Sequence, residues 1–199
     1  MQSTMQGGSL FRWFEQLCRI KIERLRNAVL PKGDRIQGNV IPALGGVYVF
    51  WWMTGPAKLR SKECNRRLQL KGPGGRWVGM VIDDDWLGLS TDLPIPLYVG
   101  KSGGSLRNRI GQHLMLSKLR ILSRGRRSKK EKAPTTSCQL RAGVEHLFPF
   151  EIDTRSLILD NVGFSFVELP NDGNAVNRFY LEDLAIGLMR PVLNVDIER

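Results

Sequence analysis

The spacing of hydrophobic residues changes along the chain, and each change predicts a different element. Near the amino terminus, apolar positions recur at helical intervals among basic residues, at Leu10, Trp13, Phe14, Leu17 and Ile20. This period predicts an amphipathic helix that ends at Pro31 and Gly33, since proline and glycine disrupt helices. From residue 46 to residue 52 the pattern is an unbroken aliphatic and aromatic run after one glycine. Such a run predicts a central strand that is buried on both faces.

Three strands and two helices account for the predicted core. Apolar runs and alternation predict the strands at 46–52, 96–100 and 162–169. Helical spacing predicts helices at 106–117 and 176–190, the second ending before Pro191. A chain of 199 residues can form one such core, because single domains usually hold about 100 to 200 residues. The predicted fold class is therefore α/β (α+β).

Other segments are additions to this core. Residues 53–94 contain scattered glycines and prolines and are expected to form an inserted hairpin. Its two strand patterns lie at 68–70 and 77–82. The basic stretch at 117–136 is expected to be a loop, because its like charges repel one another and resist packing. The expected organisation is an N-terminal helical extension at 1–40, followed by one domain at 41–199.

The chain is strongly basic. Thirty Lys and Arg residues against nineteen Asp and Glu residues give a formal net charge of +11. A positive surface concentrates polyanions, so nucleic acid is the expected partner, and anionic membranes and acidic proteins are attracted by the same charge. The residues expected to contact phosphates lie in the basic loop and are Lys118, Arg120, Arg124, Arg126, Arg127, Lys129 and Lys130. The same run is also compatible with a nuclear address or a solvated linker.

No sequence pattern predicts export or insertion into a membrane. No apolar run approaches the roughly 20 residues that cross a bilayer, and the amino terminus lacks the apolar stretch of a signal peptide. The three cysteines, at positions 18, 64 and 138, fit neither a disulfide framework nor paired zinc ligands. We therefore expect a cytoplasmic protein with no membrane partner.

Several residues suit the hydrolysis of a phosphodiester, which requires an activated water, positive charge near the phosphorane and a protonated leaving oxygen. The candidates are Tyr48, Tyr98, Lys101, Arg109, His113, Glu182 and Asn194. A phenol with a pKa near 10 is only about one part in a thousand ionised at pH 7, so a tyrosine base needs nearby cations. Lys101, Arg109 and a metal ion are the expected cations. Tyr48 is the favoured base and Tyr98 is expected to position water or phosphate, and these two roles are exchangeable.

The remaining candidates divide between the metal and the phosphate. A single carboxylate completed by waters and a substrate phosphate suits Mg²⁺ (or Mn²⁺), and Glu182 is the expected metal ligand. Arg109 and His113 share one helix face, so both are expected to approach the same phosphate. There Arg109 would stabilise developing charge and His113 would donate or relay a proton. Asn194 is expected to fix the Glu182 region by hydrogen bonding.

These residues occur in a characteristic order along the chain. The order is Gly46-Val47-Tyr48, Tyr98-Val99-Gly100-Lys101, Leu106 with Arg109 and His113, Glu182, and Pro191 with Asn194. The set resembles the GIY-YIG nuclease family over about residues 45–114 and 176–195, and looks most like its compact restriction endonucleases. The resemblance implies a three-stranded antiparallel sheet flanked by helices and a metal-dependent endonuclease activity, with double-stranded DNA as the expected partner. Cleavage of both strands by one site per chain would favour a homodimer.

Other chemistries fit the sequence less well. Residues 100–102 look like the end of a phosphate-binding P-loop, but Ile95 stands where that motif requires glycine. The carboxylates at 83–85 suit a solvated bend better than a metal site, and Cys138 with His146 suits a buried free thiol better than a nucleophile. Two alternatives to a DNA endonuclease stay open: a nucleic-acid-binding protein without catalysis, and an RNA-processing nuclease.

Overall fold

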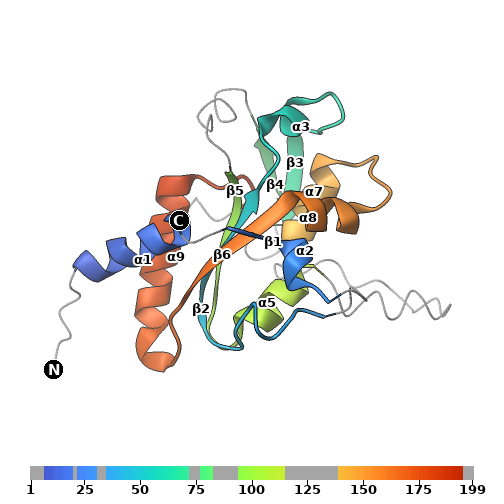
Figure 1. The fold of residues 1–199 in the computed structure, drawn as a ribbon. Helices are drawn as coiled ribbons and strands as arrows, with labels where there is room; N and C mark the ends of the chain where they lie inside the picture. The colour runs from blue at the N-terminus through green and yellow to red at the C-terminus, as the bar shows by residue number, and fades with distance from the viewer. Residues whose placement is uncertain are drawn as a thin grey trace.

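The computed structural model describes residues 7–19, 22–30, 35–71, 77–82, 94–114 and 139–194. Its main elements, in chain order, are α1 (Gly7–Arg19), β1 (Glu23–Arg24), α2 (Leu25–Ala28), β2 (Gly46–Trp52), α3 (Pro56–Arg60), β3 (Arg67–Lys71), β4 (Trp77–Val81), β5 (Ile95–Ser102), α5 (Leu106–His113), α7 (Gln139–Leu147), α8 (Thr154–Asn161), β6 (Val162–Glu168) and α9 (Ala175–Met189) (Figure 1). The fold is mixed α/β, as the sequence predicts.

The core is an antiparallel sheet of four strands in the order β1-β6-β2-β5. Strand β2 lies between β6 and β5, and all seven of its residues are buried. The unbroken apolar run of this strand is therefore explained, and its predicted central place is confirmed. In the register, Tyr48 of β2 lies opposite Gly100 of β5 and Phe166 of β6. Strand β5 is an edge of the sheet.

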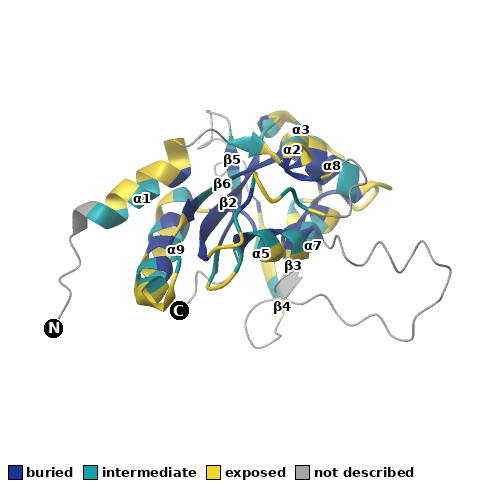
Figure 2. Ribbon diagram, turned by 60° about the horizontal axis from the view of Figure 1, so that its bottom comes forward, coloured by how far each residue is buried: buried dark blue, intermediate teal, exposed yellow. Residues whose placement is uncertain are grey.

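Each face of the sheet is covered by its own helices (Figure 2). On one face, Tyr48 and Phe50 pack with residues of α5, α7 and α8. On the other face, Val47 and Val49 pack with residues of α1 and α9. Successive side chains of a strand point to opposite faces, and this alternation decides which helices surround the tyrosine.

The inserted hairpin predicted between the core strands is confirmed. Strands β3 and β4 pair antiparallel in a separate two-stranded sheet. Leu68 of β3 is only 1% exposed and belongs to the main core, and α7 packs against the same strand. The hairpin is therefore anchored to the domain at its base.

The helices α5 and α9 lie where the sequence predicts helices, and their boundaries have local causes. The Ser105 side chain accepts a hydrogen bond from the Asn108 N–H at 3.2 Å and so caps the start of α5. Helix α9 ends where Arg190 adopts a left-handed conformation, with φ of 49°, immediately before Pro191. Helix α5 is described to His113, short of the predicted end at 117, and the basic loop at 117–136 lies outside the described residues.

The amino-terminal segment departs from the prediction. Helix α1 ends at Arg19 and does not continue toward Pro31, and the short strand β1 follows it. Because Glu23 and Arg24 pair with β6, the sheet has four strands, and the prediction of three was wrong. Two polar residues carry no hydrophobic alternation, so no pattern marks them as a strand.

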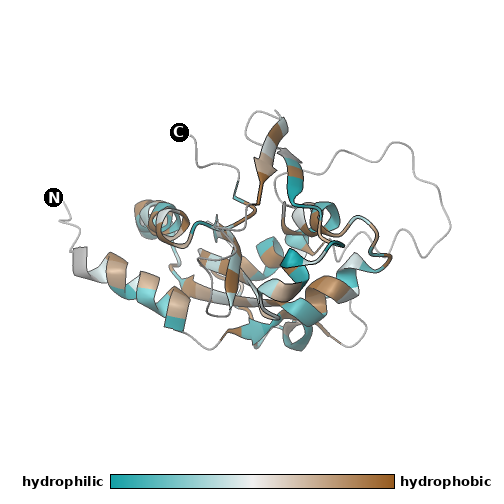
Figure 3. Cartoon of the chain, turned by 90° about the horizontal axis from the view of Figure 1, so that it is seen from above, coloured by the Kyte–Doolittle hydropathy of each residue, from teal (hydrophilic) through white to brown (hydrophobic). Residues whose placement is uncertain are grey.

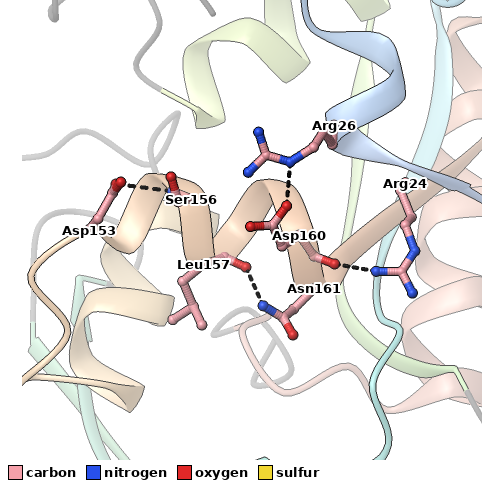
Figure 4. A network of polar contacts seen from close by, with 7 residues as sticks. All are labelled: Arg24, Arg26, Asp153, Ser156, Leu157, Asp160 and Asn161. Carbon is pink, nitrogen blue, oxygen red and sulfur yellow. Dashed lines mark hydrogen bonds and ion pairs between the residues drawn. The ribbon is translucent and has the colours of Figure 1, made fainter.

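Polar contacts hold this amino-terminal segment against α8 (Figure 4). The Arg26 guanidinium pairs with the Asp160 carboxylate, and Arg24 donates to the main-chain carbonyl of Asp160. At the other end of α8, the Asp153 carboxylate accepts a hydrogen bond from the Ser156 N–H at 3.0 Å and caps the helix. Residues 23–28 therefore pack on the same body as β6 and α8.

Three further short helices were not predicted. Helices α3, α7 and α8 contain five, nine and eight residues. Segments of this length give only about one to three turns, which is too few for a hydrophobic period to stand out. Across the ranges that the structure describes, no helix is long and apolar enough to cross a membrane.

Candidate active site

Two tyrosines lie side by side on neighbouring strands. Tyr48 of β2 and Tyr98 of β5 belong to the same face of the sheet, and their ring centroids are 6.3 Å apart. Tyr48 is fully buried and Tyr98 is 7% exposed. The two phenols predicted to act together are therefore brought together by the β2–β5 register.

Gly100 has no side chain, and this absence leaves room for the two tyrosine rings. It lies opposite Tyr48 in the register, and a Cβ atom at this position would be 2.5 Å from the Tyr48 hydroxyl oxygen and 2.8 Å from Cε1 of Tyr98. Both separations are shorter than any ordinary contact between such atoms. The glycine of the Tyr98-Val99-Gly100 motif is thus required by close packing.

His113 of α5 packs beneath the same two rings. Its Nε2 atom is 2.6 Å from the Tyr48 hydroxyl oxygen, and its Nδ1 atom accepts the Leu140 N–H of α7 at 3.4 Å. Because Nδ1 is an acceptor, the hydrogen-bond network assigns the single proton of the neutral imidazole to Nε2. His113 therefore donates this hydrogen bond and Tyr48 accepts it.

Burial keeps His113 neutral. The imidazole is 0% exposed, and this burial, together with the nearby charge of Arg109, lowers its pKa from 6.5 to about 3. A neutral His113 is an N–H donor to Tyr48 and carries no proton that it releases near neutral pH. The sequence-based expectation that His113 hands a proton to the substrate has no support in this geometry, because the proton on Nε2 is directed at Tyr48.

Arg109 lies one helical turn before His113 and faces both phenols. Burial acts to lower the pKa of its guanidinium, but Coulombic attraction to Tyr48 and Tyr98 and hydrogen bonds with them outweigh burial, and the pKa is raised. Its Nε atom is buried and has no hydrogen-bond partner among the residues described. A phosphate oxygen that reached this guanidinium could satisfy the Nε donor.

The groups around Tyr48 shift the pKa of its phenol in opposite directions. Burial raises the pKa of the Tyr48 phenol well above its ordinary value, and the neighbouring Tyr98 acts in the same direction. The charge and the hydrogen bond of Arg109 lower it, and the Glu182 carboxylate raises it. Tyr48 is therefore a neutral phenol until further positive charge arrives at the site.

Lys101 and Glu182 form an ion pair beside the phenols. Lys101 is on β5, and Glu182 comes from α9, which packs on the opposite face of the sheet from α5. The Lys101 ammonium also lies 5.0 Å from the centre of the Phe179 ring. The Glu182 side chain is only 14% exposed. A carboxylate from one side of the sheet and a guanidinium from the other thus both act on Tyr48.

The donor set of this site fits a magnesium or manganese ion. Within the described ranges, no three His, Cys, Asp or Glu side chains gather into one cluster. Glu182 offers one carboxylate to this site, and a small divalent cation that keeps most of its waters suits a single carboxylate and a substrate phosphate. The Lys101 ammonium occupies the Glu182 oxygen, so a metal ion would share or replace this contact.

Asn194 lies against the other edge of β5. Its amide oxygen accepts the Val99 N–H at 2.8 Å, and its amide nitrogen donates to the Val99 carbonyl at 2.9 Å. Both polar groups of an edge-strand residue, placed between Tyr98 and Gly100, are satisfied by this single side chain. The expectation that Asn194 fixes the Glu182 region is therefore replaced by a more specific role, since Asn194 positions the strand that carries Tyr98.

Sequence reasoning missed Arg178, which lies one helical turn before Glu182. This guanidinium is 5% exposed and donates to the carbonyls of Leu169 and Asn171 at 2.6 and 2.8 Å. It fixes the turn that leads into α9, and so acts as a positioning residue for Glu182. The available signal was an arginine on the buried face of a largely apolar helix.

Several predicted residues cannot be placed. The phosphate-contacting candidates Lys118, Arg120, Arg124, Arg126, Arg127, Lys129 and Lys130, the carboxylates at 83–85, and Cys138 lie outside the described residues. His146 is described, and its Nδ1 atom lies 2.8 Å from the carbonyl oxygen of Ala142 within α7.

Comparison with known proteins gives this chain no relative. No protein-family model matches it, and neither does any curated protein or any solved structure. The function is therefore inferred from the site itself.

Proposed function

We propose that this chain is a metal-dependent endonuclease of the GIY-YIG type that hydrolyses phosphodiester bonds in DNA. The observation that carries the proposal is a convergence of six side chains from two strands and two helices, and the two helices pack on opposite faces of the sheet. They are Tyr48, Tyr98, Arg109, His113 and the Glu182 carboxylate with its Lys101 partner. A base for the attacking water and positive charge near the phosphate are both supplied by this cluster, and the leaving oxygen would take its proton from a water molecule.

The hydrogen bond from His113 favours Tyr48 over Tyr98 as the base. An N–H donated to the phenol oxygen stabilises the phenolate form, and Arg109 stabilises the same form by its charge. The Tyr48 phenolate would take the proton of the attacking water, and Tyr98, which is the more exposed of the two, would orient that water or the phosphate.

The cations of the site would stabilise the negative charge that develops on the phosphate. Arg109 would donate to the non-bridging oxygens as they gain negative charge, and its unpartnered Nε atom is available for this. Glu182 would hold Mg²⁺ or Mn²⁺, which when bound polarises the scissile phosphate. Lys101 would then be freed from Glu182 to pair with phosphate oxygens.

A plasmid cleavage assay tests the proposal. Supercoiled plasmid is incubated in Mg²⁺ or Mn²⁺ with the wild type, with Glu182→Ala, and with Asp183→Ala as a matched control on the exposed side of the same helix. We expect nicked or linear DNA from the wild type and from Asp183→Ala, and a rate at least about 100-fold lower from Glu182→Ala. Equal cleavage by wild type and Glu182→Ala would contradict the proposal.

The same assay separates the alternatives. DNA that is retarded but intact with both the wild type and Glu182→Ala would indicate a nucleic-acid-binding protein without catalysis. The net charge of +11 would then serve DNA binding alone. Cleavage of structured RNA in place of DNA would indicate an RNA-processing nuclease.

A further inference from the structure

The outer face of the β3–β4 hairpin is exposed and is not used by the site described above. Arg67 and Gln69 of β3 are exposed, and Trp77 and Val81 of β4 are 64% and 71% exposed. Large exposed apolar residues that share one face of a strand are typical of a surface that meets a partner. The inner face is occupied by Leu68, so the hairpin presents one face to the core and the other to solvent.

The charge of the surrounding segment identifies the kind of partner. Residues 56–71, which comprise α3, the following turn and β3, contain six Lys or Arg residues against one acidic residue, Glu63. Among the residues that the structure describes, none pairs with the Arg67 guanidinium. A basic strand with an exposed tryptophan opposite it is complementary to a polyanion that also offers apolar surface, as the bases and sugars of nucleic acid do.

The register of the hairpin leaves Gln69 unobstructed. Gln69 lies opposite Gly79, and a Cβ atom placed on Gly79 would have no atom within 4 Å. Arg67, two residues earlier on the same strand, lies opposite Val81. Residues two apart on a strand are separated by about 6.6 Å, close to twice the 3.4 Å rise of a base pair. The two side chains are therefore spaced to meet base pairs two steps apart along the duplex.

Helix α7 supports both the hairpin and α5. Helix α7 packs against β3 and also against α5, which carries Arg109 and His113. Figure 2 shows the hairpin beside α7, and its buried residues belong to the face of the sheet that holds the two phenols. Anchoring through Leu68 and Ile82 makes it a fixed extension of the domain.

From these observations we infer that the β3–β4 hairpin is a DNA-binding ribbon that enters the major groove of the duplex, with Arg67 and Gln69 directed at base edges and Trp77 packed against the strand beside them. The inference rests on the proposed endonuclease function for its substrate. The major groove of B-form DNA admits a two-stranded ribbon, whereas that of A-form RNA is too narrow for side chains to read. Double-stranded DNA is therefore the proposed partner of the hairpin.

Binding is measured apart from cleavage, by fluorescence anisotropy of labelled duplexes in EDTA with the full chain. The variants are Arg67→Ala, Gln69→Ala and Trp77→Ala, and Arg12→Ala on α1 is the control that removes the same charge from the other side of the sheet. We expect the dissociation constant to rise about 10-fold for Arg67→Ala and to change less than about 2-fold for Arg12→Ala. Thermal unfolding of each variant shows whether the fold is kept.

A chemical change in the DNA tests placement in the groove. Arginine and glutamine read the N7 acceptors of guanine and adenine, which 7-deazapurines lack. Duplexes that contain 7-deazapurines should bind the wild type more weakly, and Arg67→Ala combined with Gln69→Ala should abolish this difference. An equal loss for wild type and variant on the modified DNA would overturn the inference, as would wild-type affinity of all three hairpin variants.

Two further outcomes keep this inference apart from the proposed function. Hairpin-dependent DNA binding by a wild type that never cuts in Mg²⁺ would overturn the endonuclease proposal and support the ribbon. Hairpin variants that keep DNA affinity but change the molar mass in light scattering would show that this face contacts a second copy of the chain, which overturns the ribbon and leaves the endonuclease standing.

Discussion

The Nε2 atom of His113 lies 2.6 Å from the hydroxyl oxygen of Tyr48, although the two residues are 65 positions apart in the chain. Because Nδ1 of His113 already accepts a main-chain N–H, the phenol oxygen is the acceptor in this bond. The Tyr48 proton is therefore not held by His113, and it is free to leave when positive charge reaches the site. This arrangement makes Tyr48 the residue on which the activity should depend most.

Replacing Tyr48 with phenylalanine should abolish cleavage while keeping the fold. Loss of a general base typically lowers the rate about 10²- to 10⁴-fold. The buried N–H of His113 would lose its acceptor, and the free energy of unfolding should fall by about 1–3 kcal/mol. Single-turnover cleavage and urea unfolding measure the two effects, with Tyr180→Phe on the exposed side of α9 as the control. Cleavage by Tyr48→Phe at the wild-type rate would exclude Tyr48 as the base.

The stability of the protein should fall in mild acid because of His113. Its pKa is about 3 in the folded protein and 6.5 ordinarily, so between these pH values the unfolded chain binds a proton that the folded chain does not. The free energy of unfolding is then highest above pH 6.5 and decreases as the pH falls toward 3, by up to about 1.4 kcal/mol per pH unit. Urea unfolding between pH 4.5 and 6.5 should give a shallower slope for His113→Gln. Identical slopes would show that His113 is not buried as a neutral imidazole.

Adding a methyl group at Gly100 should damage the site, whereas adding one at Gly187 should not. A Cβ atom at Gly100 would meet the Tyr48 hydroxyl oxygen at 2.5 Å, while one at Gly187 in α9 has open space around it. We expect Gly100→Ala to lower the free energy of unfolding by about 1–3 kcal/mol and to reduce cleavage about 100-fold through displacement of the phenol. Gly187→Ala should raise it by about 0.4–1 kcal/mol. Thermal unfolding and cleavage rates check both.

Asn194 should stabilise the edge strand β5, which carries Tyr98. Asn194→Leu leaves the N–H and the carbonyl of Val99 without partners, at a cost of about 1–3 kcal/mol for each buried group. Asn194→Asp keeps the bond from the N–H and loses the other, so its effect should be intermediate. Hydrogen exchange of the Val99 amide should accelerate more in Asn194→Leu than in Asn194→Asp. Unchanged exchange in both variants would mean that Asn194 does not hold this strand.

Lys101 should compete with a divalent cation for Glu182. Removing the ammonium in Lys101→Met should strengthen Mn²⁺ binding about 2- to 5-fold, because a partly exposed ion pair of this kind contributes about 0.5–1 kcal/mol. Electron paramagnetic resonance of free Mn²⁺ measures this without DNA. Lys58→Met is the matched control, because Lys58 also lies over a phenylalanine ring, that of Phe148. Weaker Mn²⁺ binding in Lys101→Met would show that Lys101 does not compete with the ion.

The strand and helix pattern of the core was predictable because each element is long enough to show a period. The apolar run of β2, the hairpin β3–β4 and the helix α9 all carry such a pattern. The strand β1 and the helices α3, α7 and α8 are short, and they form where tertiary contacts select them. The Arg26–Asp160 contact that helps to hold β1 and α2 in place joins residues 134 positions apart, and no local pattern indicates it.

The sequence indicated which residues form the site, but it did not indicate which of their atoms contact one another. Helical spacing placed Arg109 and His113 on one face, and the strand motifs named Tyr48, Tyr98 and Gly100. Which atom of His113 faces Tyr48, and which residue Asn194 binds, depend on how β2, β5, α5 and α9 pack. Hydrogen bonds and pKa shifts are set by distances of a few ångströms and by burial, and the folded chain alone fixes both. Periodicity therefore determined the elements of this protein, and packing around the sheet decided its chemistry.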